Sequence, residues 1–444
     1  MKFNLIILMS KICLKLLKLL GRGSSLPGEI ALKFDKQLMK KFKINGKIIA
    51  VTGSSGKGST SSMLVNTLRG LGYTVAHNMK GSNLKFGIAT LLIENCNLKG
   101  ELTQDYVVFE MDERYAKYVF CDIEPDFVIV TNVTRDQPPR QGNVDVVLND
   151  IKKAIPEKSQ IILNADSPYM YKLIQGLDNK VSYYSVNKNK YSTQESIYKK
   201  LNIYTCPECG TKLTYEYYNF EENGKYRCKE CDFYTPKAIC TVTNIDYTNN
   251  NLLINNEYPI NSETKLLFNV YNIAACFCAL MLLDVDLKKS SDILSSDKLN
   301  KKIYSCISKK DKKVYILNNK NENATTFNQS LHFVNQFEGK KTIVVGWYQI
   351  SRRYEFNDIS WLYDIDFEIL NSHDIDSIIC VGPERYDIAT RFKLANIDSK
   401  KIYTFEDVKS AINYLPNTKG DIFAILNFDY VKPFTKLIKE DKND

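Results

Sequence analysis

The N-terminal segment lacks a long apolar run, although MKFNLIILMSKICLKLLKLLGRG superficially resembles a signal peptide. Its longest uncharged stretch, Phe3 to Ser10, is too short to span a bilayer. It also lacks the small-residue cleavage site that would follow in a secretory signal. We therefore expect neither a transmembrane span nor a secretory signal in this segment.

The composition excludes a disordered or fibrous protein, because 44% of the residues are hydrophobic and 25% are charged. Eight of the twelve cysteines have no disulfide-framework spacing, which favours the reducing cytosol. A length of 444 residues predicts two or three domains. The net charge of +9 favours anionic partners, a class that includes nucleotides, anionic lipids, acidic small molecules and nucleic acid.

The first 44 residues are predicted to form a basic amphipathic helical segment. Lys11, Lys15, Lys18 and Arg22 recur at helical spacing and leave leucine and isoleucine on the remaining surface. Packing of this helix on the domain behind it is the favoured interpretation. Contact with the inner face of the membrane is the alternative.

Short runs rich in valine and isoleucine alternate with helical segments from Lys47 onward, as buried parallel strands do. We expect strands at 48–51, 106–111, 126–131 and 160–164. The carboxyl ends of such strands form the ligand crevice of an open α/β sheet, so the polar clusters that follow them should face one site. Runs at 342–347, 377–382 and 421–426 predict a second doubly wound sheet.

The stretch TGSSGKGST, residues 52–60, is typical of a phosphate-binding loop, although its spacing differs from G-x-x-x-x-G-K-[ST]. Its glycines would let backbone N–H groups approach phosphate oxygens. Lys57 would neutralise the β and γ phosphates, and the hydroxyl of Ser59 or Thr60 would ligate Mg²⁺. A capped helix start is the alternative, but strand, loop and helix occur in the order that nucleotide binding needs. The expected nucleotide contacts are Gly53, Ser54, Ser55, Gly56, Lys57, Gly58, Ser59 and Thr60.

A carboxylate is expected to assist Mg²⁺ beside this loop. Glu110 is the best candidate, because it ends an apolar strand. Asp112 and Glu113 follow closely and could orient substrate or solvent. Solvated acids at a strand end are the alternative.

Two CxxC pairs, separated by 18 residues, predict a structural zinc site. The pairs are Cys206 with Cys209 and Cys228 with Cys231. Four thiolates close the coordination shell, so the Zn²⁺ should be structural, and the small hairpin between the pairs should depend on it. Redox use of the pairs is the alternative.

Several stretches resemble the central ATP-binding domain of the Mur ligases and the related folylpolyglutamate synthases. These are TGSSGKGST, HNMKGSN (77–83), FEMDE (109–113), TNVTRDQ (131–137), LNADSP (163–168) and FNVYNIAA (268–275). The four-cysteine insert, SLPGEIALKFD (25–35) and NDISWLYDIDFE (357–368) narrow the resemblance to the MurT family, over nearly the whole chain. The resemblance adds Asn272 to the expected nucleotide contacts.

This resemblance implies an α/β architecture with three parts. Residues 1–44 would form the N-terminal segment, and 45–297 a Mur ligase-type parallel-sheet ATPase domain with a zinc-ribbon insert at about 202–236. Residues 298–444 would form a C-terminal α/β domain. MurT proteins are thought to use ATP and Mg²⁺ to phosphorylate the α-carboxylate of D-glutamate in the lipid II stem peptide at the membrane surface. Ammonia from GatD, a glutamine amidotransferase subunit, then displaces phosphate to leave D-isoglutamine.

The resemblance also singles out Asp358 in the motif D-x-S-W. The corresponding acid is proposed to reach into GatD and complete a Cys-His-Asp triad, where it would orient the histidine. This chain has only three histidines and no obvious Cys-His glutaminase signature, so the nucleophile would come from a GatD-like partner. Asp364 and Asp366 are nearby competitors, and capping of a loop is the alternative role.

Two other functions stay open, and a third is disfavoured. The first is a degenerate scaffold subunit without turnover. It is suggested by the segment 322–328, which departs from a KNPAG-like family stretch, and by Asn300-Lys301, which replaces a typical Gly-Arg pair. A folylpolyglutamate synthase-like ligase shares the loop but would not need the cysteines. A nucleic-acid-binding module is disfavoured because the lysines do not gather around the cysteines, so we expect no nucleic-acid partner.

Overall fold

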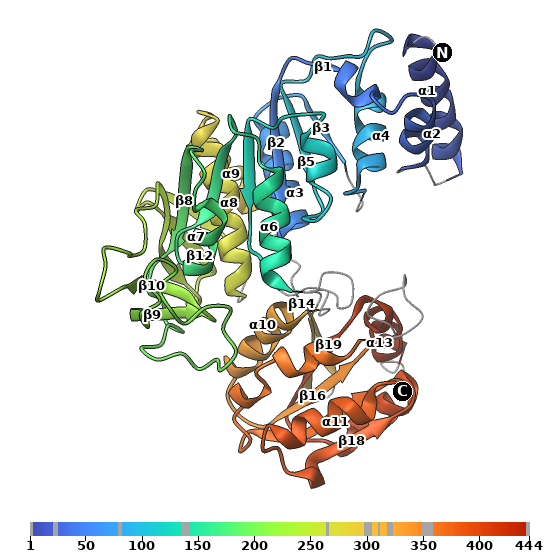
Figure 1. Cartoon of the computed structure of the whole chain (residues 1–444). Helices are drawn as coiled ribbons and strands as arrows, with labels where there is room; N and C mark the ends of the chain where they lie inside the picture. The colour runs from blue at the N-terminus through green and yellow to red at the C-terminus, as the bar shows by residue number, and fades with distance from the viewer. Residues whose placement is uncertain are drawn as a thin grey trace.

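The structure is a computed structural model that describes residues 3–20, 25–78, 82–134, 143–262, 266–296, 304–309, 311–317, 323–347 and 358–440. Figure 1 shows the N-terminal helices at one end of the molecule, a large sheet in the middle and a second sheet at the other end. The predicted junction near residue 298 lies outside the described residues, as do Asn300-Lys301 and residues 348–357 before Asp358.

The large sheet has nine strands in the order β13-β12-β11-β8-β7-β6-β2-β5-β3. The strands from β11 to β3 are parallel, and β12 and β13 add an antiparallel edge. The four strands expected in the first half correspond to β2, β5, β6 and β7. The bounds are β2 (Lys47–Thr52), β3 (Val75–His77), β5 (Tyr106–Glu110), β6 (Phe127–Val130), β7 (Gln160–Asn164), β8 (Val181–Val186), β11 (Cys240–Asp246), β12 (Asn251–Ile254) and β13 (Tyr258–Asn261).

Helices cover both faces of this sheet, which explains why its central strands are continuously apolar. One face packs on α3 (Lys57–Gly70), α8 (Leu267–Leu282) and α9 (Leu287–Ser296), and the other on α4 (Lys85–Asn95), α5 (Lys117–Phe120), α6 (Val144–Ala154) and α7 (Pro168–Ile174). Ile49 and Val51 of β2 enter the first core, whereas Ala50 enters the second. This alternation fixes the register of β2, and therefore the position of the loop that follows it.

The N-terminal segment packs on α4 at the edge of the large sheet. It contains α1 (Phe3–Leu19), α2 (Leu26–Phe34), η1 (Leu38–Lys41) and β1 (Lys43–Ile44), which pairs with β4 (Glu101–Leu102). Ile6 and Ile7 of α1 share a core with Ile88 and Leu92 of α4. The prediction that this helix packs on the domain behind it is confirmed for one of its faces.

The cysteine insert leaves the large sheet after β8 and returns as its neighbour β11. It contains an antiparallel hairpin of β9 (Thr214–Phe220) and β10 (Asn223–Arg227). Its own apolar core holds little beyond Leu213, Tyr226, Phe233 and two of the cysteines. Such a small core favours a metal as an additional staple.

The C-terminal sheet has six strands in the order β14-β15-β19-β16-β17-β18, and only β14 is antiparallel to its neighbour. The three predicted strands correspond to β16, β17 and β19. The bounds are β14 (Tyr304–Lys309), β15 (Lys312–Leu317), β16 (Lys341–Gly346), β17 (Ile375–Val381), β18 (Ile402–Phe405) and β19 (Asp421–Leu426).

Helices α10 (Ala324–Asn335) and α11 (Arg385–Leu394) cover one face of this sheet, and α12 (Val408–Tyr414) and α13 (Phe428–Glu440) cover the other. The remaining turns are η3 (Ser360–Asp364), η4 (Phe367–Ile369), η5 (Ser399–Lys401) and η6 (Leu415–Asn417). The expected second α/β sheet is therefore present.

Candidate functional site: a phosphate loop bordered by the cysteine insert

The glycine-rich loop lies between the end of β2 and the start of α3, as expected. Residues 131–134, which follow β6, hold it in place through backbone and side-chain hydrogen bonds. Ser54 Oγ donates to Thr134 O and accepts from Thr134 N, both at 2.9 Å. Asn132 Oδ1 accepts from the backbone N–H of Ser55 at 3.0 Å, and Asn132 Nδ2 donates to Ser55 O at 3.0 Å. The loop is therefore shaped by the protein itself.

Two glycines of the loop occupy positions that other residues cannot. Gly53 has φ +126°, and a Cβ there would lie 2.4 Å from Thr131 Oγ1. Gly56 has φ +81°, and a Cβ there would lie 2.2 Å from Asn272 Oδ1 on α8. Without side chains at these two positions, the backbone N–H groups of the loop stay open to a ligand. A phosphate site at the N-terminus of a 14-residue helix requires such access.

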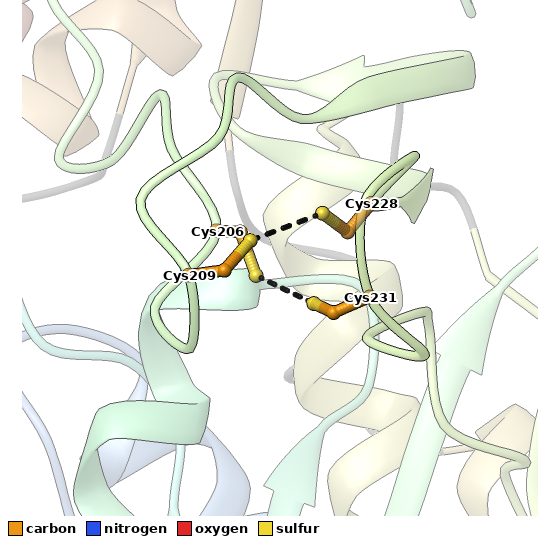
Figure 2. A group of neighbouring side chains, drawn as sticks. All are labelled: Cys206, Cys209, Cys228 and Cys231. Carbon is orange, nitrogen blue, oxygen red and sulfur yellow. Dashed lines mark hydrogen bonds between the residues drawn. The ribbon is translucent and has the colours of Figure 1, made fainter.

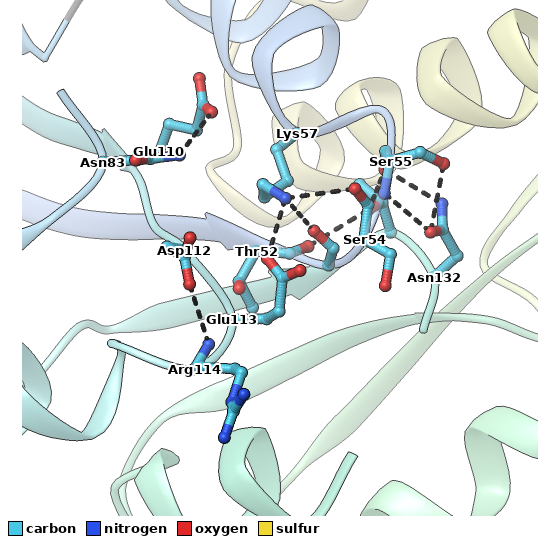
Figure 3. Close-up of polar contacts among 12 residues, drawn as sticks. Thr52, Ser54, Ser55, Lys57, Asn83, Glu110, Asp112, Glu113, Arg114 and Asn132 are labelled. Atoms are coloured by element: carbon cyan, nitrogen blue, oxygen red, sulfur yellow. Dashed lines mark hydrogen bonds and ion pairs between the residues drawn. The ribbon is translucent and has the colours of Figure 1, made fainter. Parts of the chain in front are cut away.

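Lys57, the first residue of α3, points back over the loop (Figure 3). Its Nζ donates to the carbonyls of Gly53 and Ser54 and lies 2.9 Å from Glu113 Oε2. The ion pair is well shielded, with exposed side-chain fractions of 12% for Lys57 and 1% for Glu113. A phosphate entering the loop could replace carbonyl contacts of Lys57 while Glu113 continues to orient the ammonium group.

Glu110, at the end of β5, lies beside the first turn of α3. A Cβ at Gly58 would be 3.2 Å from Glu110 Oε2. Asn78 fixes the Glu110 backbone by accepting from its N–H at 2.8 Å and donating to its carbonyl at 2.9 Å. Asn83 Nδ2 lies 3.4 Å from Glu110 Oε1 (Figure 3). A carboxylate directed at a phosphate loop is the oxygen donor that Mg²⁺ prefers.

The two candidate hydroxyls differ in access. Thr60 is fully buried, and its Oγ1 has no hydrogen-bond partner in the described part of the chain. Ser59 is half-buried at the loop end of α3. Ser59 and Glu110 are therefore the accessible oxygen donors that fit a metal ion at this position.

A cavity of about 60 Å³ adjoins the loop and is lined by Ser55 and Asn272 on one side. Glu221 and Glu222, in the turn between β9 and β10, and Gln329 of α10 also line it. Among the described residues, the buried atoms Asn272 Nδ2, Glu222 Oε2 and Gln329 Oε1 have no hydrogen-bond partner. Unpaired polar atoms are costly in a buried position, so the cavity offers hydrogen-bonding positions to a small polar group.

Glu221 and Glu222 were not predicted from the sequence. Glu221 joins the cysteine insert to the C-terminal sheet domain, because its carboxylate accepts from Asn328 Nδ2 at 3.0 Å and from Thr325 Oγ1 at 3.3 Å. Glu221 has φ +48° and is 6% exposed. Burial, reinforced by the charge of Glu222, raises the pKa of Glu221 to about 8. Two adjacent acids in a tyrosine-rich hairpin were the only sequence signal.

The structure brings the four cysteines together, as Figure 2 shows. Their sulfur atoms all lie within 4.8 Å of one another, with Cys206 Sγ 3.5 Å from Cys231 Sγ and Cys209 Sγ 3.4 Å from Cys228 Sγ. Tetrahedral Zn²⁺ with Zn–S distances of about 2.3 Å would set sulfurs about 3.8 Å apart. Hydrogen bonding from Thr211 lowers the pKa of Cys209, whereas burial raises the pKa of Cys206, so without a metal ion the cluster holds thiol as well as thiolate sulfur. The donor set and its spacing therefore fit a structural zinc ion.

Asp358 lies just before η3 and is half-buried, and its Oδ1 accepts from Ser360 N at 2.9 Å. Asp366 is fully buried and accepts from the backbone N–H groups of Lys199 and Lys200 at 3.2 and 3.3 Å, so it is used inside the protein. The half-buried Asp364 lines a separate cavity with Lys200. Asp358 therefore caps a turn, which is the alternative role given above. Its part in a partner triad stays a prediction.

Comparisons with known proteins agree with this architecture. A family model described as Mur ligase middle domain matches residues 51–229, and one described as MurT ligase C-terminal matches residues 320–430. The lipid II isoglutaminyl synthase (glutamine-hydrolyzing) subunit MurT of Staphylococcus aureus (strain COL) is 29% identical over 417 residues, which cover 93% of this chain and 92% of that protein. The same subunit from Streptococcus pneumoniae is 28% identical over 405 residues, 90% of this chain and 88% of that protein.

A solved structure of a pseudomurein peptide ligase type C from Methanothermus fervidus superposes with a TM-score of 0.67 and 21% identity, over 92% of this chain and 81% of that chain. This likeness supports the Mur ligase-type α/β fold with parallel sheets. The two family matches and the nearly full-length relatives establish that this chain belongs to the MurT family of Mur-type ligases.

Proposed function

We propose that this chain is the ligase subunit of a two-subunit enzyme that amidates the α-carboxylate of D-glutamate in the lipid II stem peptide, using ATP and Mg²⁺. The proposal takes its substrate class from the MurT subunits of lipid II isoglutaminyl synthases, which the chain resembles over more than nine tenths of its length. The observation that carries it is the glycine-rich loop at the carboxyl end of β2, which has the Lys57 ammonium group and the Glu110 carboxylate beside it.

The chemistry follows from the weakness of a carboxylate as an electrophile. A carboxylate oxygen would attack the γ-phosphorus of ATP, so that an O–P bond forms and ADP leaves. Ammonia would then attack the carbonyl carbon of the acyl phosphate, and inorganic phosphate would depart with that same carboxylate oxygen. Proton loss from the attacking nitrogen leaves the amide.

The residues of the loop would stabilise the charge that shifts during phosphoryl transfer. The backbone N–H groups at the start of α3 and the Lys57 ammonium group would face the phosphates, as preorganised donors do in phosphoryl transfer. Mg²⁺, when bound, would neutralise phosphate charge, and Ser59 and Glu110 are the residues that would hold it. Glu113 would keep Lys57 oriented.

The unpaired polar atoms in the cavity lined by Asn272 and Glu222 would hydrogen-bond to a polar edge of the nucleoside part of ATP. The C-terminal sheet domain would close this cavity from the side of α10, because Gln329 lines it and Asn328 bonds to Glu221. Closure would exclude water that could hydrolyse the acyl phosphate.

A GatD-like glutamine amidotransferase would supply the ammonia. Asp358 would extend from the C-terminal sheet domain into the partner and complete its Cys-His-Asp triad. Trp361, three residues later, is fully buried against Trp347, with ring centroids 5.1 Å apart. This packing would anchor the segment that presents Asp358.

Zn²⁺ would serve the insert as a structural ion, because four cysteines leave no open coordination position. The enzyme would work in the cytoplasm at the inner face of the membrane, where the lipid substrate resides. Among the described helices, none has both the length and the apolar character needed to cross a bilayer.

The direct test is mass spectrometry of lipid II incubated with the purified chain, ATP, Mg²⁺ and ammonium ions, without a partner. We expect conversion of the D-glutamate carboxylate to its amide, and no conversion with Lys57→Ala at unchanged zinc content. Equal conversion by Lys57→Ala would refute the role of the loop. Absence of both ATP binding and conversion in folded, zinc-loaded protein would point instead to a scaffold without turnover.

A further inference from the structure

Helix α1 carries two apolar faces, and only one of them is buried. Ile6, Ile7, Ser10 and Leu14 face the rest of the protein. On the other face, apolar side chains with exposed fractions between 42% and 80% follow one another along the helix: Leu5, Leu8, Met9, Ile12, Leu16 and Leu19. At 3.6 residues per turn these six side chains fall within an arc of about 100°, so they form one continuous stripe, here called the α1 stripe.

An exposed apolar stripe along a whole helix is unusual on a protein surface that faces only water. The stripe runs from Leu5 to Leu19 and is about 21 Å long, most of the length of this 17-residue helix. It is held rigidly, because Phe3 packs edge-on against Phe42 with ring centroids 5.8 Å apart and Lys11 donates to Glu94 O on α4. The stripe is therefore a fixed surface and not the side of a loose tail.

The charge of the molecule is concentrated in this same segment. Residues 1–44 contain ten Lys and Arg and two Asp and Glu, so eight of the nine net positive charges of the chain lie there. Lys11, Lys15 and Lys18 lie along one flank of the α1 stripe, where Lys18 pairs with Glu94 of α4, and α1 itself contains no acidic residue. The two acids of the segment, Glu29 and Asp35, pair with Lys33 and Lys41 of the same segment.

We propose that the α1 stripe is a membrane-docking surface that lies in the interface of an anionic bilayer, with the stripe among the acyl chains and the lysines at the headgroups. An apolar face flanked by lysines on a helix too short to span is the pattern of an interfacial helix. Basic residues close to such a face add attraction to anionic lipid headgroups. The lysine flank complements anionic headgroups and the α1 stripe complements acyl chains, so an anionic bilayer matches both features of the helix.

The position of α1 agrees with this role. Figure 1 shows α1 and α2 at the end of the molecule that is remote from the C-terminal sheet. Docking through α1 would therefore leave the D-x-S-W segment of the C-terminal sheet domain accessible to a partner. The biological purpose of the docking rests on the proposed function, since it would bring the enzyme to a substrate anchored in the same bilayer.

Sedimentation with vesicles tests the proposal on the full, zinc-loaded chain without lipid II or ATP. Vesicles of phosphatidylcholine mixed with phosphatidylglycerol are compared with vesicles of phosphatidylcholine alone. We expect binding to the anionic vesicles that weakens as salt is raised, and much weaker binding to the neutral ones. Because neither substrate nor nucleotide is present, failure of this test would leave the proposed ligase activity untouched.

The variant Ile12→Glu/Leu16→Glu should lower partitioning onto anionic vesicles by roughly tenfold or more for each apolar side chain replaced. Its matched control is Tyr386→Glu/Leu394→Glu, which adds the same charge at equally exposed positions on α11 and should bind like the wild type. Unchanged zinc content and amidation of detergent-solubilised lipid II would show that each variant is folded.

A second measurement does not depend on a charged substitution. Ile12→Trp places an indole on the α1 stripe, and brominated lipids should quench its fluorescence if the stripe enters the acyl region. Wild-type protein that binds neither kind of vesicle, or an Ile12→Glu/Leu16→Glu variant that binds like the wild type, would overturn the proposal. The proposal would also be overturned if the wild type binds no vesicles but dimerises with rising concentration, and if Ile12→Glu/Leu16→Glu abolishes that dimerisation. A second copy of the chain would then cover the stripe.

Discussion

Replacing Glu221 by glutamine should flatten the pH dependence of the free energy of unfolding. The carboxyl group of Glu221 is buried between the cysteine insert and α10, where Asn328 and Thr325 donate to it. Burial and the neighbouring charge of Glu222 raise the pKa of Glu221 from 4.5 to about 8. Glutamine keeps the shape and an acceptor oxygen but does not titrate.

The sign follows from the protons that each state holds. Between pH 4.5 and about 8 the unfolded chain has released this proton while the folded protein retains it. The contribution of Glu221 to stability is therefore fully present below 4.5 and is lost as the pH rises toward 8, at about 1.4 kcal/mol per unit. Over the whole window the loss is on the order of a few kcal/mol, and Glu222 shares in it because the two buried acids titrate together.

Urea unfolding at a series of pH values inside this window measures the effect. Trp347 and Trp361 are the natural probes, because both are buried in the C-terminal sheet domain that Glu221 contacts. The stability of the wild type should fall relative to Glu221→Gln as the pH rises. Glu216→Gln is the control, since Glu216 lies on the same hairpin in an exposed pair with Lys225. Parallel profiles for the wild type and Glu221→Gln would refute the reasoning.

Three further substitutions test the site. Gly56→Ala should weaken ATP binding by roughly tenfold or more, measured by calorimetry, because the added methyl group would clash with the Asn272 side-chain amide. The control is Gly72→Ala, which also places alanine at a positive φ but in open space, and which should bind ATP normally. Asp358→Asn should spare amidation driven by ammonium ions and lower glutamine-driven amidation by roughly a thousandfold or more in the presence of the partner; equal losses with both nitrogen sources would contradict a triad role. Cys228→Ser should lose zinc by elemental analysis and melt at a lower temperature, whereas Cys306→Ser, outside the cluster, should do neither; retained zinc in Cys228→Ser would contradict the site.

Features that depend on neighbouring residues were predictable from the sequence. The loop between β2 and α3 follows from a strand, three glycines and a helix in succession, and the cysteine cluster follows from two CxxC pairs. Both patterns encode geometry locally. The zinc ion itself and the roles of the loop residues stay predictions.

Features that depend on distant parts of the chain were not predictable. Glu221 contacts Asn328, which lies 107 residues later in the chain. The spacing of apolar residues does not predict that the tip of a hairpin contacts a helix of the C-terminal sheet domain. The helical spacing of α1 indicated an apolar surface, but only its packing on α4 shows which half of that surface is buried. The choice between Ser59 and Thr60 likewise depends on burial, which their adjacency in the sequence hides.

The central claim is that this chain activates a carboxylate by phosphorylating it with ATP. The most direct test uses lipid II in which both oxygens of the D-glutamate α-carboxylate carry a heavy isotope, incubated with the chain, ATP, Mg²⁺ and ammonium ions. The proposed reaction predicts that each amide formed is matched by one inorganic phosphate that contains one labelled oxygen. Amide formation with unlabelled phosphate, or ATP hydrolysis without any amide, would contradict the account.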